Sequence, residues 1–353
     1  MTGRNIYSLI DQGNISHKKA DGKIVFSFLR RLLLIGLVAW LAYYFYAYRP
    51  WPPLAGTPES SPPAKADQNL SSEGFASAKK SPLTFEVSLT ASPRVGEAAT
   101  LLISWSGDYD FARGQVRLAD NSFPLYLIRP GRLFAFLPVS YWQKPGPAEL
   151  IISLRDVSGQ EKEIKQSIAI LDRSYPKEEL TVSQELTNLR TEDKIKADSQ
   201  KLARAKGESA DHPLWQDRFL LPAPGEITTE YGLIRVINGQ ESERHSGLDI
   251  ANKKGTPILA TNSGRVTLAD DLYVTGKTVV IDHGLNLYSS YSHLASLKVR
   301  EGDLVQKGQV IGEMGSTGFS TGSHLHWVIS VGRTPVDPKS FLDGTILPSV
   351  PGR

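Results

Sequence analysis

Three short stretches in the last third of the chain decide how the rest is interpreted: HSGLD at residues 245–249, YSHL at 291–294 and GSHLHW at 322–327. Together they supply four histidines and one aspartate, side chains that bind divalent cations or transfer protons. The chain contains no cysteine, which excludes both a thiolate metal site and a disulfide framework. These stretches therefore indicate a metal site built from imidazole and carboxylate groups.

The spacing within two of these stretches favours convergence. His324 and His326 are separated by one residue and are followed by the apolar run WVISV. Side chains of a strand alternate between its two faces, so both imidazoles should share one face while Leu325 enters the core. His245 and Asp249 are four residues apart, and this even spacing lets them converge from one strand or its bend. Either pair alone is a weak signal, because such spacings occur by chance.

His293 ends the alternating stretch VVIDHGLNLYSSYSHL, residues 279–294. With it, the number of candidate groups exceeds what a catalytic zinc ion binds, because such an ion keeps one position open for water. We therefore expect three groups to hold the metal and two histidines to remain free for proton transfer. His283, which directly follows the expected strand VVID, is expected to be a structural histidine at a strand end.

A longer series of motifs resembles the LytM-like (lysostaphin-type) zinc metallopeptidases over residues 211–347. In chain order the motifs are ERHSGLDIA, GTPILA, VVIDHG, YSHL, VREGDLVQKGQVIG and GSTGFSTGSHLHW. The resemblance implies that His245, Asp249 and His326 bind one Zn²⁺, and that His293 and His324 are the catalytic histidines. Which of these two histidines is the general base stays open.

The resemblance implies a zinc-dependent endopeptidase that hydrolyses peptide bonds of peptidoglycan, in the stem peptide or the cross-link, during cell-wall remodelling. The alternative is a non-catalytic LytM-like scaffold that activates a cell-wall amidase. Such scaffolds lose ligands, whereas all five positions are intact here. Val328 stands where many members carry an acidic residue, a departure that removes no ligand. With 40 basic and 37 acidic residues, the charge balance gives no reason to expect a nucleic-acid partner.

An apolar and aromatic run, LLLIGLVAWLAYYFYAY at residues 32–48, predicts a transmembrane helix over 26–48. At about 1.5 Å per residue this helix spans roughly 34 Å, enough for the hydrocarbon core of a bilayer. Six basic residues precede the run and one arginine lies just after it, which places the tail, residues 1–25, in the cytoplasm. Bulky tyrosines end the run, where a cleaved signal peptide needs small residues. We expect a single-pass protein of the bacterial inner membrane, with its catalytic domain in the periplasm or envelope space.

The remaining chain divides by composition. Residues 49–82 are rich in proline and serine and predict an extended tether, whereas 83–172 alternate between turn residues and predict a small antiparallel β-sandwich. The sandwich is expected to be a spacer or positioning module, with substrate or partner binding as the alternative. The charged stretch 173–212 predicts one exposed connecting helix at about 184–206, before the peptidase domain at 213–347. The expected fold is mainly β: a transmembrane helix, a β-sandwich, a connecting helix and a C-terminal antiparallel β LytM-type peptidase domain.

Overall fold

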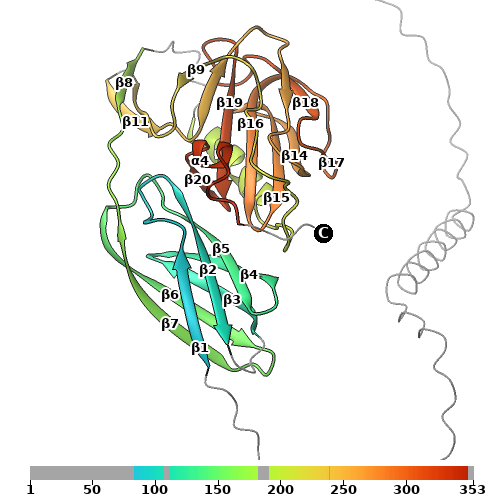
Figure 1. Cartoon of the computed structure of the whole chain (residues 1–353). Helices are drawn as coiled ribbons and strands as arrows, with labels where there is room; N and C mark the ends of the chain where they lie inside the picture. The colour runs from blue at the N-terminus through green and yellow to red at the C-terminus, as the bar shows by residue number, and fades with distance from the viewer. Residues whose placement is uncertain (1–82, 107–110, 182–190, 238, 349–353) are drawn as a thin grey trace, which may run out of the picture. The chain divides into compact units, whose positions relative to one another are not determined.

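The computed structural model describes residues 83–106, 111–181, 191–237 and 239–348 (Figure 1). The predicted tail, transmembrane helix and tether, residues 1–82, lie outside these ranges. Within them, no helix combines the length and apolarity needed to cross a membrane. The prediction of a mainly β chain is confirmed, since strands far outnumber helices in the described residues.

The first domain is a seven-stranded antiparallel sheet with the strand order β1-β2-β5-β4-β3-β6-β7. Its strands are β1 (Thr84–Leu89), β2 (Ala98–Ser106), β3 (Phe111–Leu118), β4 (Asn121–Arg129), β5 (Arg132–Pro138), β6 (Gly146–Asp156) and β7 (Glu161–Ile170). Leu101 and Leu133 from one half of the sheet share a core with Val116 and Ile152 from the other half. The sheet therefore folds over itself, and one continuous sheet encloses the sandwich core.

Strand β5 is buried on both faces. Leu133 and Leu137 point into the sandwich core, whereas Phe134 belongs to the core of the following domain. Beside it, the ring of Phe136 lies 5.9 Å from that of Trp215 and 6.0 Å from that of Phe341. The two faces of β5 thus link the sandwich to the C-terminal domain through an aromatic contact.

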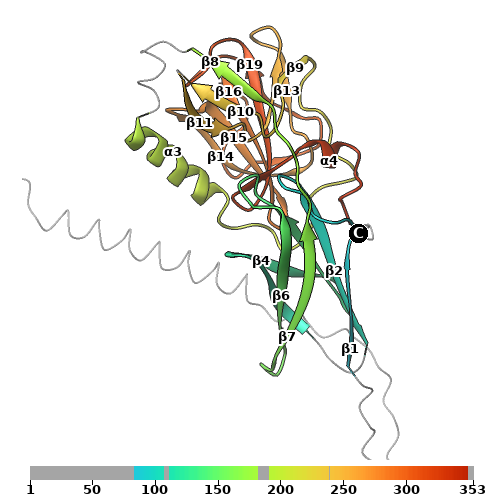
Figure 2. The same ribbon diagram turned by 90° about the vertical axis from the view of Figure 1, so that its left-hand side faces the viewer.

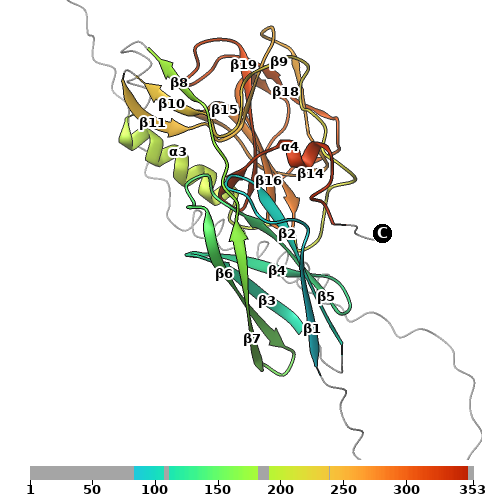
Figure 3. The ribbon, with the colours of Figure 1, turned by 60° about the vertical axis from the view of Figure 1, so that its left-hand side comes forward.

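A connecting region follows the sandwich. Strand β8 (Lys177–Leu180) pairs in parallel with β10 (Ile234–Ile237), which pairs with β11 (Gln240–Arg244), as Figure 3 shows. Helix α3 (Glu192–Ala205) begins later than predicted, and residues 184–190 of the predicted helix lie outside the described ranges. Acidic residues in its first turn and an arginine in its last suit the helix dipole.

Helix α3 keeps an exposed face, as predicted, but its other side packs against the neighbouring sheet. Ala205 and Leu202 pack against Leu268, Leu272 and Tyr288 of the C-terminal sheet. Figure 2 shows α3 lying along this sheet. The few apolar residues of the helix form a short buried stripe, too narrow to be recognised from periodicity.

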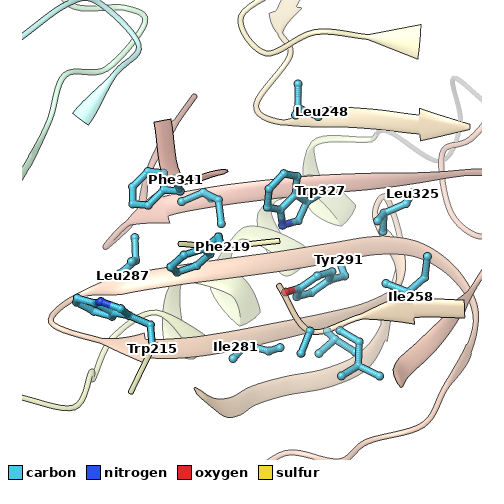
Figure 4. Packing of buried hydrophobic residues seen from close by; sticks show 14 of the residues in the cluster. Trp215, Phe219, Leu248, Ile258, Ile281, Leu287, Tyr291, Leu325, Trp327 and Phe341 are labelled. Atoms are coloured by element: carbon cyan, nitrogen blue, oxygen red, sulfur yellow. The ribbon is translucent and has the colours of Figure 1, made fainter. Parts of the chain in front are cut away.

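The C-terminal domain is a ten-stranded sheet with the main order β17-β14-β15-β16-β19-β12-β9, to which β13, β18 and β20 are added. The strands are β9 (Glu226–Thr229), β12 (Leu248–Ala251), β13 (Pro257–Leu259), β14 (Gly264–Leu272), β15 (Gly276–Gly284), β16 (Leu287–Leu297), β17 (Leu304–Val305), β18 (Val310–Met314), β19 (His324–Val331) and β20 (Thr334–Val336), followed by α4 (Lys339–Leu342). Its core gathers Trp327, Tyr291 and Leu325 from β19 and β16, together with Phe341 of α4 (Figure 4). One face of β16 and β19 is thereby anchored, which leaves the opposite face for the site.

Candidate metal centre

Three adjacent strands bring the predicted site residues together. β12 pairs with β19 so that Asp249 lies opposite His326, and β16 pairs with β19 so that Ser292 also lies opposite His326. Leu325 is fully buried, so the expected alternation of β19 is present. His324 and His326 consequently share the face that turns away from the core.

His245 lies on the bend between β11 and β12. Its backbone N–H donates to the carbonyl of Leu233 at 2.8 Å, and its carbonyl accepts the N–H of Gly232 at 2.7 Å. A Cβ on Gly247 would lie 2.2 Å from the carbonyl oxygen of Trp327, so only glycine allows the bend to approach β19 this closely. The bend turns His245 back toward Asp249.

The three predicted ligands converge on one point. Nε2 of His245 lies 2.8 Å from Oδ1 of Asp249 and 3.0 Å from Nδ1 of His326, which itself lies 2.8 Å from Oδ1 of Asp249. Zinc bonds of about 2.0–2.1 Å in a tetrahedral site separate donor atoms by roughly 3.3 Å. The two imidazoles and the carboxylate therefore fit a zinc ion, and these residues form a group that could hold a metal.

Each of the three side chains is oriented by a contact on its other polar atom. Nδ1 of His245 donates to the carbonyl of Glu230 at 2.9 Å, which leaves Nε2 as an electron-pair donor. Nε2 of His326 lies 3.2 Å from Oγ of Ser246, and a guanidinium nitrogen of Arg235 donates to Oδ2 of Asp249 at 2.8 Å. Nε2 of His245, Oδ1 of Asp249 and Nδ1 of His326 therefore remain facing one another.

Charge and burial shift the pKa values of Asp249 and His326. Burial alone would raise the pKa of Asp249, but the close contacts of its carboxylate with the rings of His245 and His326 outweigh burial and hold the pKa well below its usual range. Burial lowers the pKa of His326, against the opposing effect of the Asp249 carboxylate. A carboxylate with neutral imidazoles is the protonation state that binds a divalent cation.

His293 occupies a β-bulge of β16. Tyr291 pairs with Val279 and Leu294 with Lys277, so two residues of β16 oppose a single residue of β15. His293 has a φ of +64°, an uncommon conformation for a residue with a side chain. Such a bulge redirects a side chain out of the regular alternation, and here it brings His293 to the site face.

The two remaining histidines lie side by side next to the candidate ligands. The ring centroids of His293 and His324 are 4.8 Å apart, and Nε2 of His324 lies 3.9 Å from Oδ1 of Asp249. Nδ1 of His293 donates to the carbonyl of Thr317 at 2.8 Å, and burial lowers its pKa to about 3, helped by His324 and His326. His293 is therefore neutral, with Nε2 available. A cavity of about 460 Å³ is lined by all five predicted site residues.

His283 is separate from this cavity. It is fully buried, with Nδ1 2.8 Å from the carbonyl of Ser263 and Nε2 2.7 Å from Oγ of Ser289. Burial lowers its pKa to about 4. These contacts suit the structural role that its position after VVID predicts. The isolated His17 lies outside the described residues.

Two residues that support the site were not singled out from the sequence. Arg235 holds Asp249 through a hydrogen bond. In the sequence, Arg235 differs from its neighbours only as the single basic residue of the strand IRVI. Asp198 of α3 accepts the backbone N–H groups of Tyr273 at 3.0 Å and Val274 at 2.7 Å. The next carbonyl, that of Thr275, accepts the backbone N–H of His293 at 2.9 Å. Within a charged helix, nothing in the sequence distinguished Asp198 from a solvated residue.

The C-terminal region matches known proteins. Residues 243–338 match the model of Peptidase family M23. A stretch of 96 residues, 27% of this chain, is 40% identical to the DD-carboxypeptidase/endopeptidase Mpg of Neisseria meningitidis serogroup B. A stretch of 93 residues, 26% of this chain, is 39% identical to the peptidoglycan DD-endopeptidase ShyA of Vibrio cholerae. The matched region spans 22% of the length of each of these relatives.

A crystal structure assigned to peptidase M23 of Pseudomonas aeruginosa shares the fold of a larger part of the chain. Its TM-score is 0.53 at 24% identity, over 72% of this chain and 96% of that chain. The region matched by the family model includes all five residues that line the candidate metal centre. Residues 243–338 therefore form a domain that matches peptidase family M23.

Proposed function

We propose that the chain is a zinc-dependent endopeptidase that hydrolyses peptide bonds of peptidoglycan, in stem peptides or cross-links. The observation that carries this proposal is the convergence of three donor atoms within 3.0 Å of one another, with two further histidines beside them. The names of the relatives support this proposal, because ShyA is named as a peptidoglycan DD-endopeptidase and Mpg as a DD-carboxypeptidase/endopeptidase.

In this proposal His245, Asp249 and His326 hold one Zn²⁺. When bound, zinc supplies polarisation of the scissile carbonyl and lowers the pKa of a bound water toward about 7. The proton from the attacking water goes to Nε2 of His293 or His324. Nδ1 of each ring is engaged by a carbonyl oxygen, of Thr317 and Gly322 respectively, so each ring keeps Nε2 for proton transfer.

The proposed location is the bacterial inner membrane, with a single span at residues 26–48 and the catalytic domain in the periplasm. The apolar run and the excess of basic residues before it support this orientation. Peptidoglycan lies on the same side of the membrane, so the substrate class and the orientation agree.

A non-catalytic scaffold that activates an amidase is the second candidate. A scaffold has no need of two free histidines beside an intact ligand set, yet all five side chains line one cavity. This retention favours the enzyme.

The test is digestion of purified peptidoglycan by the full-length protein in detergent, followed by mass spectrometry of the released fragments. Endopeptidase activity should release peptide-bond cleavage products, stop with chelator and return with zinc. Intact peptidoglycan, combined with faster cleavage by an added amidase, would support the scaffold instead.

A further inference from the structure

A second cavity adjoins the metal centre. It has a volume of about 400 Å³, and Ser246, Thr275 and His326 line both this cavity and the one that contains the predicted catalytic histidines. Leu202 and Ala203 of helix α3 and its C-cap residue Lys206 form part of the wall. A substrate bound at the metal centre can therefore extend into a space bordered by the connecting helix.

The pairing of β16 with β19 sets the distance between the two sites. Ser292 lies opposite His326, and the next pair on the same face is Ser290 opposite Val328, which forms part of the cavity floor. Residues two apart on a strand are separated by about 7 Å. An extended peptide advances at most about 3.6 Å per residue, so the floor lies about two substrate residues from the metal centre.

The lining of the second cavity is suited to an anion. It contains the two cations Lys206 and Arg333 and no carboxylate. Lys206, the C-cap of α3, is partly buried, and neither cation forms an ion pair with any residue of the described ranges. Burial lowers the pKa of Lys206 to about 8, and no neighbouring carboxylate opposes this shift. The lysine therefore stays mainly protonated at pH 7 without a balancing charge.

A hydroxyl on the floor supplies an independent observation. Ser290 is only 5% exposed, and its Oγ has no hydrogen-bond partner in the part of the chain that the structure describes. Buried hydroxyls are normally hydrogen-bonded, because leaving one unpaired costs about 1–3 kcal/mol. An acceptor in the cavity would satisfy this donor.

We propose that the cavity lined by Lys206, Arg333 and Ser290, named here the α3 subsite, binds a carboxylate of the peptide substrate. This inference rests on the proposed function and adds a specificity determinant to it. Lys206 and Arg333 supply positive charge, and the Ser290 hydroxyl donates a hydrogen bond. The carboxylate is either the C-terminal carboxylate of a stem peptide or a side-chain carboxylate within it, and both share this chemistry.

The test uses the full-length protein and peptidoglycan peptides in three forms: unmodified, C-terminally amidated and side-chain amidated. The wild-type enzyme should show a KM about tenfold higher for one amidated form, and this form identifies the source of the carboxylate. Lys206→Gln should raise the KM of the unmodified peptide to a similar extent, with little change in kcat. Lys206→Gln should leave unchanged the KM of the amidated peptide that the wild type binds more weakly.

Two further variants separate recognition from folding. Lys206→Arg keeps the charge and should restore the low KM, whereas Lys196→Gln removes an exposed charge from the same helix and should have no effect. A KM that rises equally for all peptide forms in Lys206→Gln would overturn the subsite, because a general disturbance of α3 has this effect. Equal KM values for all three peptides in the wild type would overturn it as well.

Calorimetric binding of the same peptides to the protein separates this inference from the proposed function. Absence of hydrolysis, together with carboxylate-selective binding that Lys206→Gln abolishes, would reject the endopeptidase and keep the subsite. Hydrolysis without any carboxylate selectivity in rate or binding would keep the endopeptidase and reject the subsite.

Discussion

Replacement of Asp198 by alanine tests how α3 supports the predicted catalytic histidines. The carboxylate is 4% exposed and accepts two backbone N–H groups, at 3.0 and 2.7 Å, from Tyr273 and Val274. Hydrogen bonds to a charged group contribute about 1.5–3 kcal/mol each, and the substitution also removes the cost of burying a carboxylate. We expect Asp198→Ala to lower the free energy of unfolding by about 2–4 kcal/mol.

The same substitution should reduce hydrolysis more than it reduces metal binding. The segment that Asp198 holds continues to Thr275, whose carbonyl accepts the backbone N–H of His293. None of the three predicted metal ligands depends on this contact. A displacement of about 1 Å at a catalytic group costs up to about 100-fold in rate, so kcat should fall about tenfold or more while zinc is retained.

The assay combines urea unfolding, followed by tryptophan fluorescence, with kcat measurements and zinc analysis on the same samples. Asp193→Ala is the matched control, because Asp193 is an exposed acidic residue in the first turn of α3. A change in unfolding free energy no greater than that of the control would refute the argument that Asp198 links α3 to the site.

Three other predictions concern separate parts of the molecule. His293→Ala should retain one zinc per chain and lose about 10²- to 10⁴-fold in hydrolysis rate, and an unchanged rate would remove His293 from the mechanism. His283 is buried with its pKa lowered from 6.5 to about 4, so the stability it confers is complete above about pH 6.5 and is lost as the pH falls toward 4. Urea unfolding should show that the wild type loses about 3 kcal/mol more than His283→Gln over this interval, and parallel pH profiles would contradict this. Protease added outside spheroplasts should digest the C-terminal domain, whereas full protection would show that the orientation is inverted.

The parts of the site that follow strand periodicity were predictable from the sequence. The alternation of His324, Leu325 and His326 depends only on strand geometry, and the structure has Leu325 in the core with both histidines on the other face. The grouping of His245 and Asp249 with His326 required the resemblance, because no local pattern gives the register between β12 and β19. The position of His293 depends on a β-bulge that no sequence pattern predicts.

Long-range packing accounts for what the sequence did not reveal. Arg235 contacts Asp249 from the neighbouring strand β10, and Asp198 of α3 holds the backbone segment that precedes Thr275. Lys206 lines the second cavity only because α3 lies against the peptidase sheet. The charged stretch that contains α3 has the composition of a solvated helix, so its role depends on docking. In the sandwich, the sequence predicted alternating strands but not the second buried face of β5, where Phe134 and Phe136 enter the peptidase core.

Zinc titration of the metal-free, full-length protein, with peptidoglycan cleavage as the readout, tests the central claim most directly. The proposed endopeptidase should be inactive without metal, and its rate should rise linearly until one zinc is bound per chain and then level off. Hydrolysis that proceeds at full rate without zinc would contradict the assignment of His245, Asp249 and His326 as ligands of a catalytic zinc ion, as would full zinc binding without cleavage.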